Sequence, residues 1–479
     1  RYIVEIFSGL LTLDKDTLQP VADIAESVPE PVLNADGTVT YTFSIRRGVL
    51  FHDSSRQVTA EDFKYSMERA LSPRTLSPVA LVYLGDIVGA REFNRGDAAE
   101  VTGIRVVDTF TLEVTIDAPK PYFLAKLTYP TAFVVKREQV EGNPGGWTRR
   151  PIGTGPFRME EWRLGERVVL TGNERFHLDP VPSLAKVTFL LAGGSALTMY
   201  ENGEIDATGI GVNDIESIRD PGNPLNAEFI EKPSLDTFYI GFNVEKPPFD
   251  DPKVRQAFAM AIDKEVLVRV VLLDLALPAK GILPPGMPGY NPDLEGLPFD
   301  SQGARELLAQ SSYGDNLPDI VLTSSGQGAT LGPIVDAIIA MWEGNLGVTV
   351  EVQQEEFGLF LRDLDAGNFQ LFELGWIADY ADPQNFLEIK FFSQNIGSTN
   401  ETRYNNPEVD ALLEQAQTEQ DEAKRFALYQ QAERIIVEDA AWIPLFHGKA
   451  NTLVKPYVQG YVVPPLVIPR LRYITIVEQ

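Results

Sequence analysis

The chain has 479 residues, of which 44% are hydrophobic and 23% charged, a composition typical of folded globular proteins and not of disordered ones. Acidic residues outnumber basic residues by 68 to 41, and the net charge of −27 excludes broad electrostatic binding to nucleic acid or to an anionic membrane. The absence of cysteine excludes disulfides, thiolate metal sites and cysteine nucleophiles. At about 150 residues per domain, the length predicts about three lobes.

The sequence also gives expectations about membrane-spanning helices and about what precedes the chain. It contains no stretch of about 18 uninterrupted apolar residues, so we predict no membrane-spanning helix. The chain begins at Arg1 and not at methionine, from which we expect that a segment such as a signal peptide or a lipid anchor precedes it.

The first third of the chain predicts a mixture of strands and helices. Polar and apolar residues alternate over residues 40–45 and again over residues 111–116, as in half-buried strands. Between them, Thr59 and Asp62 have the spacing of a capping box and predict the start of a helix. The glycines and proline of residues 152–157 predict a boundary.

The second half predicts a βαβαβ unit with short connections, which implies parallel strands and right-handed crossovers. Its predicted elements are strand 320–323, helix 334–342, strand 348–352, helix 357–364 and strand 369–374. Residues 409–437 then predict two amphipathic helices.

Signals for catalysis are few. The three histidines, His52, His177 and His447, are far apart, and none has the spacing of a metal site. Residues 193–197 lack the second glycine of a nucleophile elbow. We therefore predict a protein that is not an enzyme and that holds no metal and no cofactor, with a ligand-processing hydrolase as a remote alternative.

The most informative segment is residues 375–383, which follow the third strand of the βαβαβ unit. Ligands of open α/β sheets bind beyond the carboxyl ends of the strands, where this segment must lie. Trp376 and Tyr380 offer flat aromatic faces, Asp379 offers an acceptor for an ammonium group, and Gly375 lets a ligand approach the backbone.

Structural roles for the same residues stay open. Trp376 also suits a packed core, and Asp379 suits a turn. Asp382 followed by Pro383 is typical of a helix start. A calcium site at Asp379 and Asp382 is a weaker alternative, because two carboxylates fall short of the six to eight oxygens that calcium takes.

The chain resembles the extracytoplasmic solute-binding proteins of ABC importers, family 5, of the oligopeptide- and dipeptide-binding type. The resemblance extends nearly from end to end and is carried by residues 7–11, 41–48, 58–66, 152–157, 203–206, 241–243, 246–249, 254–257, 376–383 and 453–457. It implies an α/β fold of the periplasmic-binding-protein-like type II clamshell (cluster C), with two main lobes and an extra inserted lobe. The implied segments are lobe I at 1–36, 152–236 and 449–479, lobe II at 37–151, and lobe III at 237–448.

The resemblance also implies how a ligand is held. In such relatives the residue at the position of Asp379 pairs with the α-ammonium of a peptide, and backbone groups around Gly375 and Ile377 extend the peptide as an added strand. Trp376 and Tyr380 lie beside that path, and Phe357 matches an aromatic residue that lines a side-chain pocket. We further expect polar contacts from the strand between Tyr239 and Asn243, and closure of lobes I and III around the ligand.

Two departures from the family pattern are evident. Oligopeptide binders can place an arginine three residues before the tryptophan, and here that position is Glu373. The usual first strand is missing before Arg1.

The sequence therefore predicts a monomeric extracytoplasmic protein, with or without a lipid anchor, that captures short peptides and delivers them to the permease subunits of an ABC transporter. A binding protein for oligosaccharides or another polar solute is the alternative.

Overall fold

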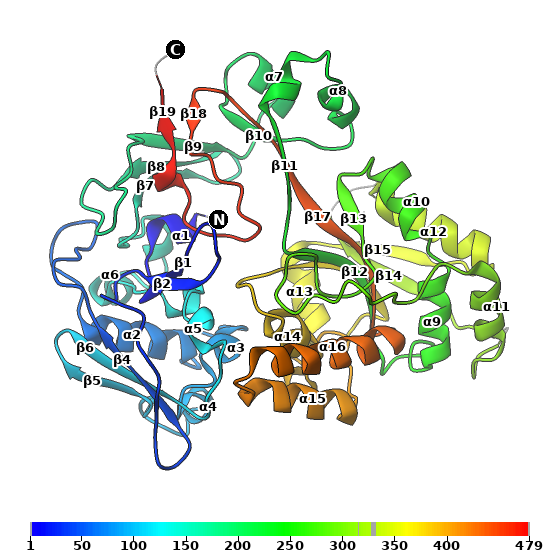
Figure 1. The fold of residues 1–479 in the computed structure, drawn as a ribbon, viewed down its shortest axis with the longest axis horizontal. Helices are drawn as coiled ribbons and strands as arrows, with labels where there is room; N and C mark the ends of the chain where they lie inside the picture. Colours follow the sequence, from blue (N-terminus) through cyan, green and yellow to red (C-terminus); the bar gives the residue numbers. More distant parts are fainter. Residues whose placement is uncertain (1, 315, 327–331, 478–479) are drawn as a thin grey trace. The chain divides into compact units, whose positions relative to one another are not determined.

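The computed structural model describes residues 2–314, 316–326 and 332–477. The chain forms two compact units. Unit 1 contains residues 1–209 and 452–479, and unit 2 contains residues 210–451 (Figure 1). The division does not separate the predicted lobes I and II, so their boundaries stay a prediction. No helix of the described residues is long and apolar enough to cross a membrane.

Unit 1 contains several small sheets. The largest has the order β3-β4-β6-β5, formed by β3 (Val32–Leu33), β4 (Val39–Ser44), β6 (Thr111–Ile116) and β5 (Ile104–Asp108). The other sheets are formed by β1 (Leu11–Leu13) with β2 (Pro20–Ala22), by β7 (Phe157–Arg163), β8 (Arg167–Gly172) and β9 (Lys186–Leu190), and by β18 (Val458–Gln459) with β19 (Thr475–Ile476). Both alternating segments of the sequence are therefore strands, and they pair with each other.

The predicted capping box opens the longest helix of unit 1, α2 (Ala60–Leu71). The backbone N–H of Thr59 donates to the Asp62 carboxylate at 2.9 Å. Phe63 and Met67 lie four residues apart on one face of this helix, and both side chains are fully buried. The other helices of this unit are α1 (Ile3–Ile6), α3 (Ala80–Leu84), α4 (Ala90–Arg95), α5 (Phe123–Lys126), α6 (Arg137–Gly142) and α7 (Ala196–Glu201).

Unit 2 is built on one large mixed sheet, whose β17 continues into unit 1 and pairs there with β10 (Ala207–Gly209). The order of its central strands is β17 (Trp442–Val454), β12 (Asp236–Phe242), β16 (Leu371–Ile377), β14 (Val321–Ser325) and β15 (Glu351–Glu355). Two further strands, β11 (Phe229–Pro233) and β13 (Ala276–Pro278), pair with β17. The pairs β14–β15 and β14–β16 are parallel, which confirms the predicted βαβαβ unit.

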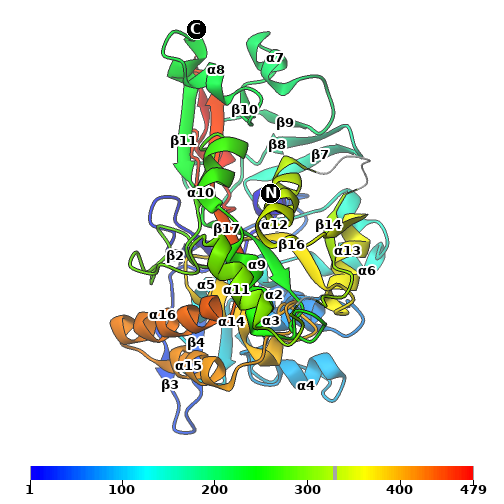
Figure 2. The same cartoon turned by 90° about the vertical axis from the view of Figure 1, so that its right-hand side faces the viewer.

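Helices cover the sheet of unit 2, and α15 (Pro407–Thr418) packs against α16 (Glu422–Glu438) as the two predicted amphipathic helices (Figures 1 and 2). The others are α8 (Ile215–Arg219), α9 (Pro252–Met260), α10 (Lys264–Val266), α11 (Ser301–Ala309), α12 (Pro333–Leu346), α13 (Phe357–Asp365) and α14 (Gln384–Phe391).

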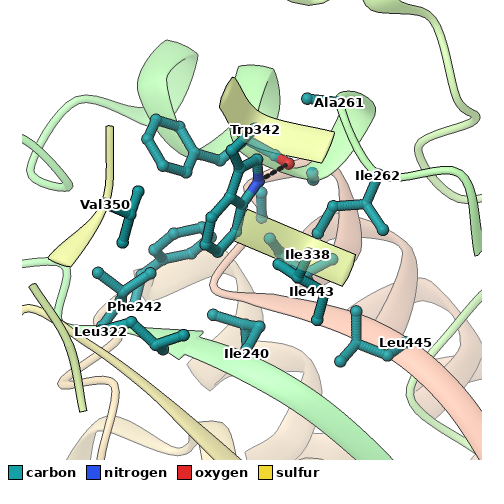
Figure 3. Packing of buried hydrophobic residues seen from close by; sticks show 14 of the residues in the cluster. Ile240, Phe242, Ala261, Ile262, Leu322, Ile338, Trp342, Val350, Ile443 and Leu445 are labelled. Carbon is teal, nitrogen blue, oxygen red and sulfur yellow. Dashed lines mark hydrogen bonds between the residues drawn. The ribbon is translucent and has the colours of Figure 1, made fainter. Parts of the chain in front are cut away.

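The main core of unit 2 surrounds the fully buried Trp342 of α12 (Figure 3). Its indole N–H donates to the carbonyl of Phe258 at 2.9 Å, so the polar atom of this large side chain is satisfied inside the core. Ile240 and Leu322 bring the strands of the sheet into the same cluster. This core fixes the strands whose ends carry the candidate site.

Candidate functional site

The carboxyl ends of β14, β15 and β16 meet at one edge of the sheet, because the three strands are parallel. Phe357 follows β15 at the start of α13, and 55% of its surface is exposed. Asp379 lies two residues after β16. The structure therefore brings Phe357 and the loop of Asp379 to the same edge, with one strand between their own, or about 10 Å at ordinary strand spacing.

One side of β16 is open next to this loop. β12 pairs with β16 along its whole length, from Leu371 to Ile377. On the other side, β14 pairs with β16 only at Leu371 and Phe372 among the described residues. Among the residues that the structure describes, the backbone from Glu373 to Ile377 thus has one side without a strand partner, as a sheet edge does.

The loop after β16 is held in shape by Asn385, a fully buried residue of α14. The Asn385 side-chain oxygen accepts from the backbone N–H of Asp379 at 3.0 Å. Its amide nitrogen donates to the half-buried Asp379 carboxylate at 3.5 Å. Its backbone carbonyl accepts the Trp376 indole N–H at 2.9 Å. Asn385 therefore positions both Asp379 and Trp376.

Trp376 has one aromatic face covered. The ammonium of Lys390 lies 4.3 Å from the centroid of the Trp376 ring, within the range of a cation–π interaction. Lys390 is fully buried and forms an ion pair with Glu401. Trp376 itself is half-buried, so it both packs against α14 and keeps a partly accessible surface.

Asp382 serves the fold. Its carboxylate accepts from the backbone N–H of Gln384 at 2.9 Å and pairs with Arg425 at 2.6 Å. A helix does begin here, one residue later than the pattern predicts, because α14 starts at Gln384 with Pro383 at its N-cap position. Among the described residues, no group of three or more acidic or histidine side chains is placed to hold a metal ion.

Three predicted contact residues lie away from accessible surface. Tyr380 is fully buried, and its hydroxyl donates to Gln384. Tyr239 is also fully buried and stacks on Trp442, with ring centroids 3.4 Å apart. Asn243 follows the end of β12 that pairs with the start of β16, and its amide nitrogen donates to the carbonyl of Gly367 at 3.0 Å. The structure does not bring Asn243 to the edge that carries Asp379, and it gives the two tyrosines supporting positions.

One face of β16 changes from buried to exposed along the strand. Glu373, Gly375 and Ile377 share one face, because alternate residues of a strand point to the same side. The core covers this face at Leu371, while Ile377 is 49% exposed. Glu373 lies between them and is half-buried, and burial raises the pKa of its carboxyl above the ordinary value.

Asn385, Lys390 and Arg425 are the positioning residues that sequence reasoning missed. The available signal was weak: α14 contains polar residues on every side, yet all eight of its residues are buried. A short helix that is buried all round must find partners for those polar groups inside the protein.

Most of the chain is similar to a known protein family. The family model described as bacterial extracellular solute-binding proteins, family 5 Middle, matches residues 19–398. The chain belongs to this family. The family and the relatives it matches are binding proteins.

Individual relatives match over nearly the whole chain. The periplasmic oligopeptide-binding protein OppA of Escherichia coli K12 is 31% identical over 468 residues, covering 95% of this chain and 84% of OppA. The probable deoxycholate-binding periplasmic protein YgiS of the same strain is 31% identical over 477 residues, covering 96% of this chain and 86% of YgiS.

The structure of the Escherichia coli murein tripeptide binding protein MppA matches with a TM-score of 0.86 and 29% identity, over 100% of this chain and 94% of MppA. This match confirms the predicted type II fold class of the family 5 solute-binding proteins.

Proposed function

We propose that this family 5 protein captures short peptides outside the cytoplasm and delivers them to the permease of an ABC transporter. The observation that carries the proposal is the open side of β16 at residues 373–377, which ends in the loop of Asp379. A peptide added along this side forms backbone hydrogen bonds whatever its side chains are.

The chemistry of the loop sets the direction of the peptide. A carboxylate at the end of the open strand is suited to the α-ammonium of the ligand, through a charge-assisted hydrogen bond. Asn385 holds the Asp379 backbone and carboxylate in place. The exposed Phe357 and the accessible part of Trp376 offer apolar surface to ligand side chains. The bound peptide then runs antiparallel to β16.

Calorimetry with free and N-acetylated tetraalanine tests this assignment. Acetylation removes the ammonium, and Asp379→Asn removes its partner, so each change is expected to weaken binding about 10- to 100-fold, since a hydrogen bond to a charged group contributes about 1.5–3 kcal/mol. Asp293→Asn, at an exposed aspartate of the same unit, is the matched control and leaves binding unchanged. Equal affinity for the free and the acetylated peptide would refute the role of Asp379.

The similarity to a probable deoxycholate-binding protein keeps another solute as the second candidate. Native mass spectrometry of the purified protein separates the two. Bound masses spaced by amino-acid residues support peptides, whereas hexose spacing or a single sterol-like mass supports the other solute.

A further inference from the structure

Glu373 is the first residue of the open side of β16, where we propose that the peptide binds, and its carboxylate has no partner among the described residues. It forms no hydrogen bond or ion pair with any residue that the structure describes, although it is half-buried. Burial is the cause of its raised pKa, with no neighbouring lysine or arginine that offsets it. Burying part of a carboxylate without a compensating charge is unfavourable, so this group is a candidate for pairing with a charge outside the fold.

The surroundings of Glu373 show where a partner can come from. Glu373 lies opposite Ile240 of β12, and Gly375 lies opposite Phe238. A Cβ atom on Gly375 would come within 2.9 Å of the Phe238 ring. Because residue 375 is glycine, no side chain of β16 stands on this face between Glu373 and the exposed Ile377. Glu373 is thus the first polar side chain beyond the core on the face that leads to the ligand loop.

On this face, β12 and β16 carry a second carboxylate and no basic residue. Asp236 lies opposite Ile377, and burial raises the pKa of its carboxyl as well. Unlike Glu373, Asp236 has a partner, because its carboxylate accepts the backbone N–H of Gly448 at 2.6 Å. The charge that is missing beside Glu373 is therefore positive.

We propose that Glu373 binds the cationic side chain of a bound peptide, so that this protein selects peptides with lysine or arginine at the third or fifth residue. The inference rests on the proposed function. Glu373 precedes Ile377 by four residues, or about 13 Å of extended chain. A ligand whose first residue lies beside Ile377 places its fifth residue beside Glu373, and a long basic side chain on the third residue, which points to the same side, extends toward it as well.

A positional scan measures this selectivity. Pentaalanine peptides with a free amino terminus receive one lysine at position two, three, four or five, and matched peptides receive norleucine, which has the length of lysine without its charge. By calorimetry, lysine is expected to bind at least 10-fold more tightly than norleucine at position three or five, and not at positions two and four.

Two variants connect the preference to Glu373. Glu373→Gln is expected to abolish the difference between lysine and norleucine while it keeps the affinity for the norleucine peptide within about twofold, which also shows that the variant is folded. Glu351→Gln, at an exposed glutamate of β15 in the same sheet, keeps the full preference.

The outcomes are distinguishable. Tight binding of all the peptides with no lysine preference in the parent protein would overturn the role of Glu373 and leave the proposed function standing. A lysine preference that persists in Glu373→Gln would also overturn it. Failure to bind any free-amino pentapeptide would reject the proposed function, and the role of Glu373 with it.

Discussion

Asp86 in unit 1 is a buried carboxylate and Glu373 in unit 2 is a half-buried one, and their surroundings are opposite. Asp86 accepts from the ammonium groups of Lys120 at 2.6 Å and Lys126 at 2.7 Å. Burial acts to raise its pKa, but the two lysines hold the pKa of Asp86 below the ordinary value. Glu373 has no such neighbours, and burial alone raises its pKa.

The difference distinguishes a carboxylate whose charge is paired within the fold from one whose charge is available to a ligand. Asp86 and its lysines complete one another inside unit 1, so nothing outside the unit is required. Glu373 is unfavourable for the fold of unit 2 and is therefore a candidate for function, since proteins retain such groups mainly at functional sites.

The largest effect is expected from Asp86→Asn, which leaves two buried lysines without their shared counter-ion. Removing one partner of a buried ion pair typically costs about 3–5 kcal/mol. Urea titration is expected to show a loss of this size in the free energy of unfolding. Asp117→Asn, at the more exposed aspartate that also contacts Lys120, serves as the control and changes stability far less. An unchanged Asp86→Asn variant would mean that the two carboxylates do not differ as described.

Arg425→Met tests whether a charge of unit 2 that does have a partner behaves like Asp86. Arg425 is the ionic partner of the buried Asp382, so its loss is expected to cost about 3 kcal/mol. Because the Asp382 carboxylate also accepts the N–H of Gln384 at the start of the helix that follows the Asp379 loop, peptide affinity is expected to fall as well. Calorimetry and urea titration of the same variant measure both effects, and unchanged affinity would show that the loop does not depend on this pair.

Each unit also contains a buried glutamate with a raised pKa, Glu433 in unit 2 and Glu5 in unit 1, and we expect the two to affect stability in the same way. Each accepts two backbone N–H groups, and burial raises the pKa of each from 4.5 to about 7. The native state therefore holds a proton that the unfolded state has released, so each glutamate makes the free energy of unfolding fall as the pH rises from about 4.5 to about 7.

Glu433→Gln and Glu5→Gln remove that ionisation and keep an oxygen acceptor. Relative to the parent, each variant is expected to gain stability between pH 5 and pH 8 by about 3 kcal/mol, at 1.36 kcal/mol per pKa unit. Taking the difference from the parent cancels the opposite trend of His447, whose pKa burial lowers to about 4 and whose contribution is lost as the pH falls below 6.5. A difference that does not change with pH would contradict the prediction.

The smallest effect is expected from Glu373→Gln in the absence of ligand. Replacing an uncompensated carboxylate by a neutral amide of the same shape is expected to raise the free energy of unfolding by about 1 kcal/mol or less. Glu351→Gln, at the exposed position in the same sheet, is expected to leave it unchanged. A clear loss of stability in Glu373→Gln would indicate that the carboxylate supports the fold after all.

The sequence predicted those parts of the structure that local patterns control. Alternation identified β4 and β6, a three-residue spacing identified the start of α2, and short connections identified the parallel βαβαβ unit. Because parallel strands end at one edge, the same pattern also placed the loop of Asp379 correctly at the end of β16.

The remainder depends on contacts that leave no periodic signal. Lys120 and Lys126 lie 34 and 40 positions from Asp86 in the chain. The open side of β16 is found where β14, as far as it is described, no longer pairs with β16 beyond Phe372, and no pattern in either strand indicates this. Tyr380 was expected beside a ligand, but an aromatic residue in a loop carries no information on which way it points, and here Gln384 one turn later accepts its hydroxyl.

The chain enters unit 2 at Ile210 and leaves it at Asn451, and the N–H of Ile210 donates to the carbonyl of Asn451 at 2.8 Å. Unit 2 is thus a single uninterrupted stretch whose two ends lie side by side. Every residue assigned to ligand recognition belongs to this stretch. We therefore expect that a gene segment encoding it, exchanged between homologues as one cassette, carries its binding preferences onto an unaltered unit 1.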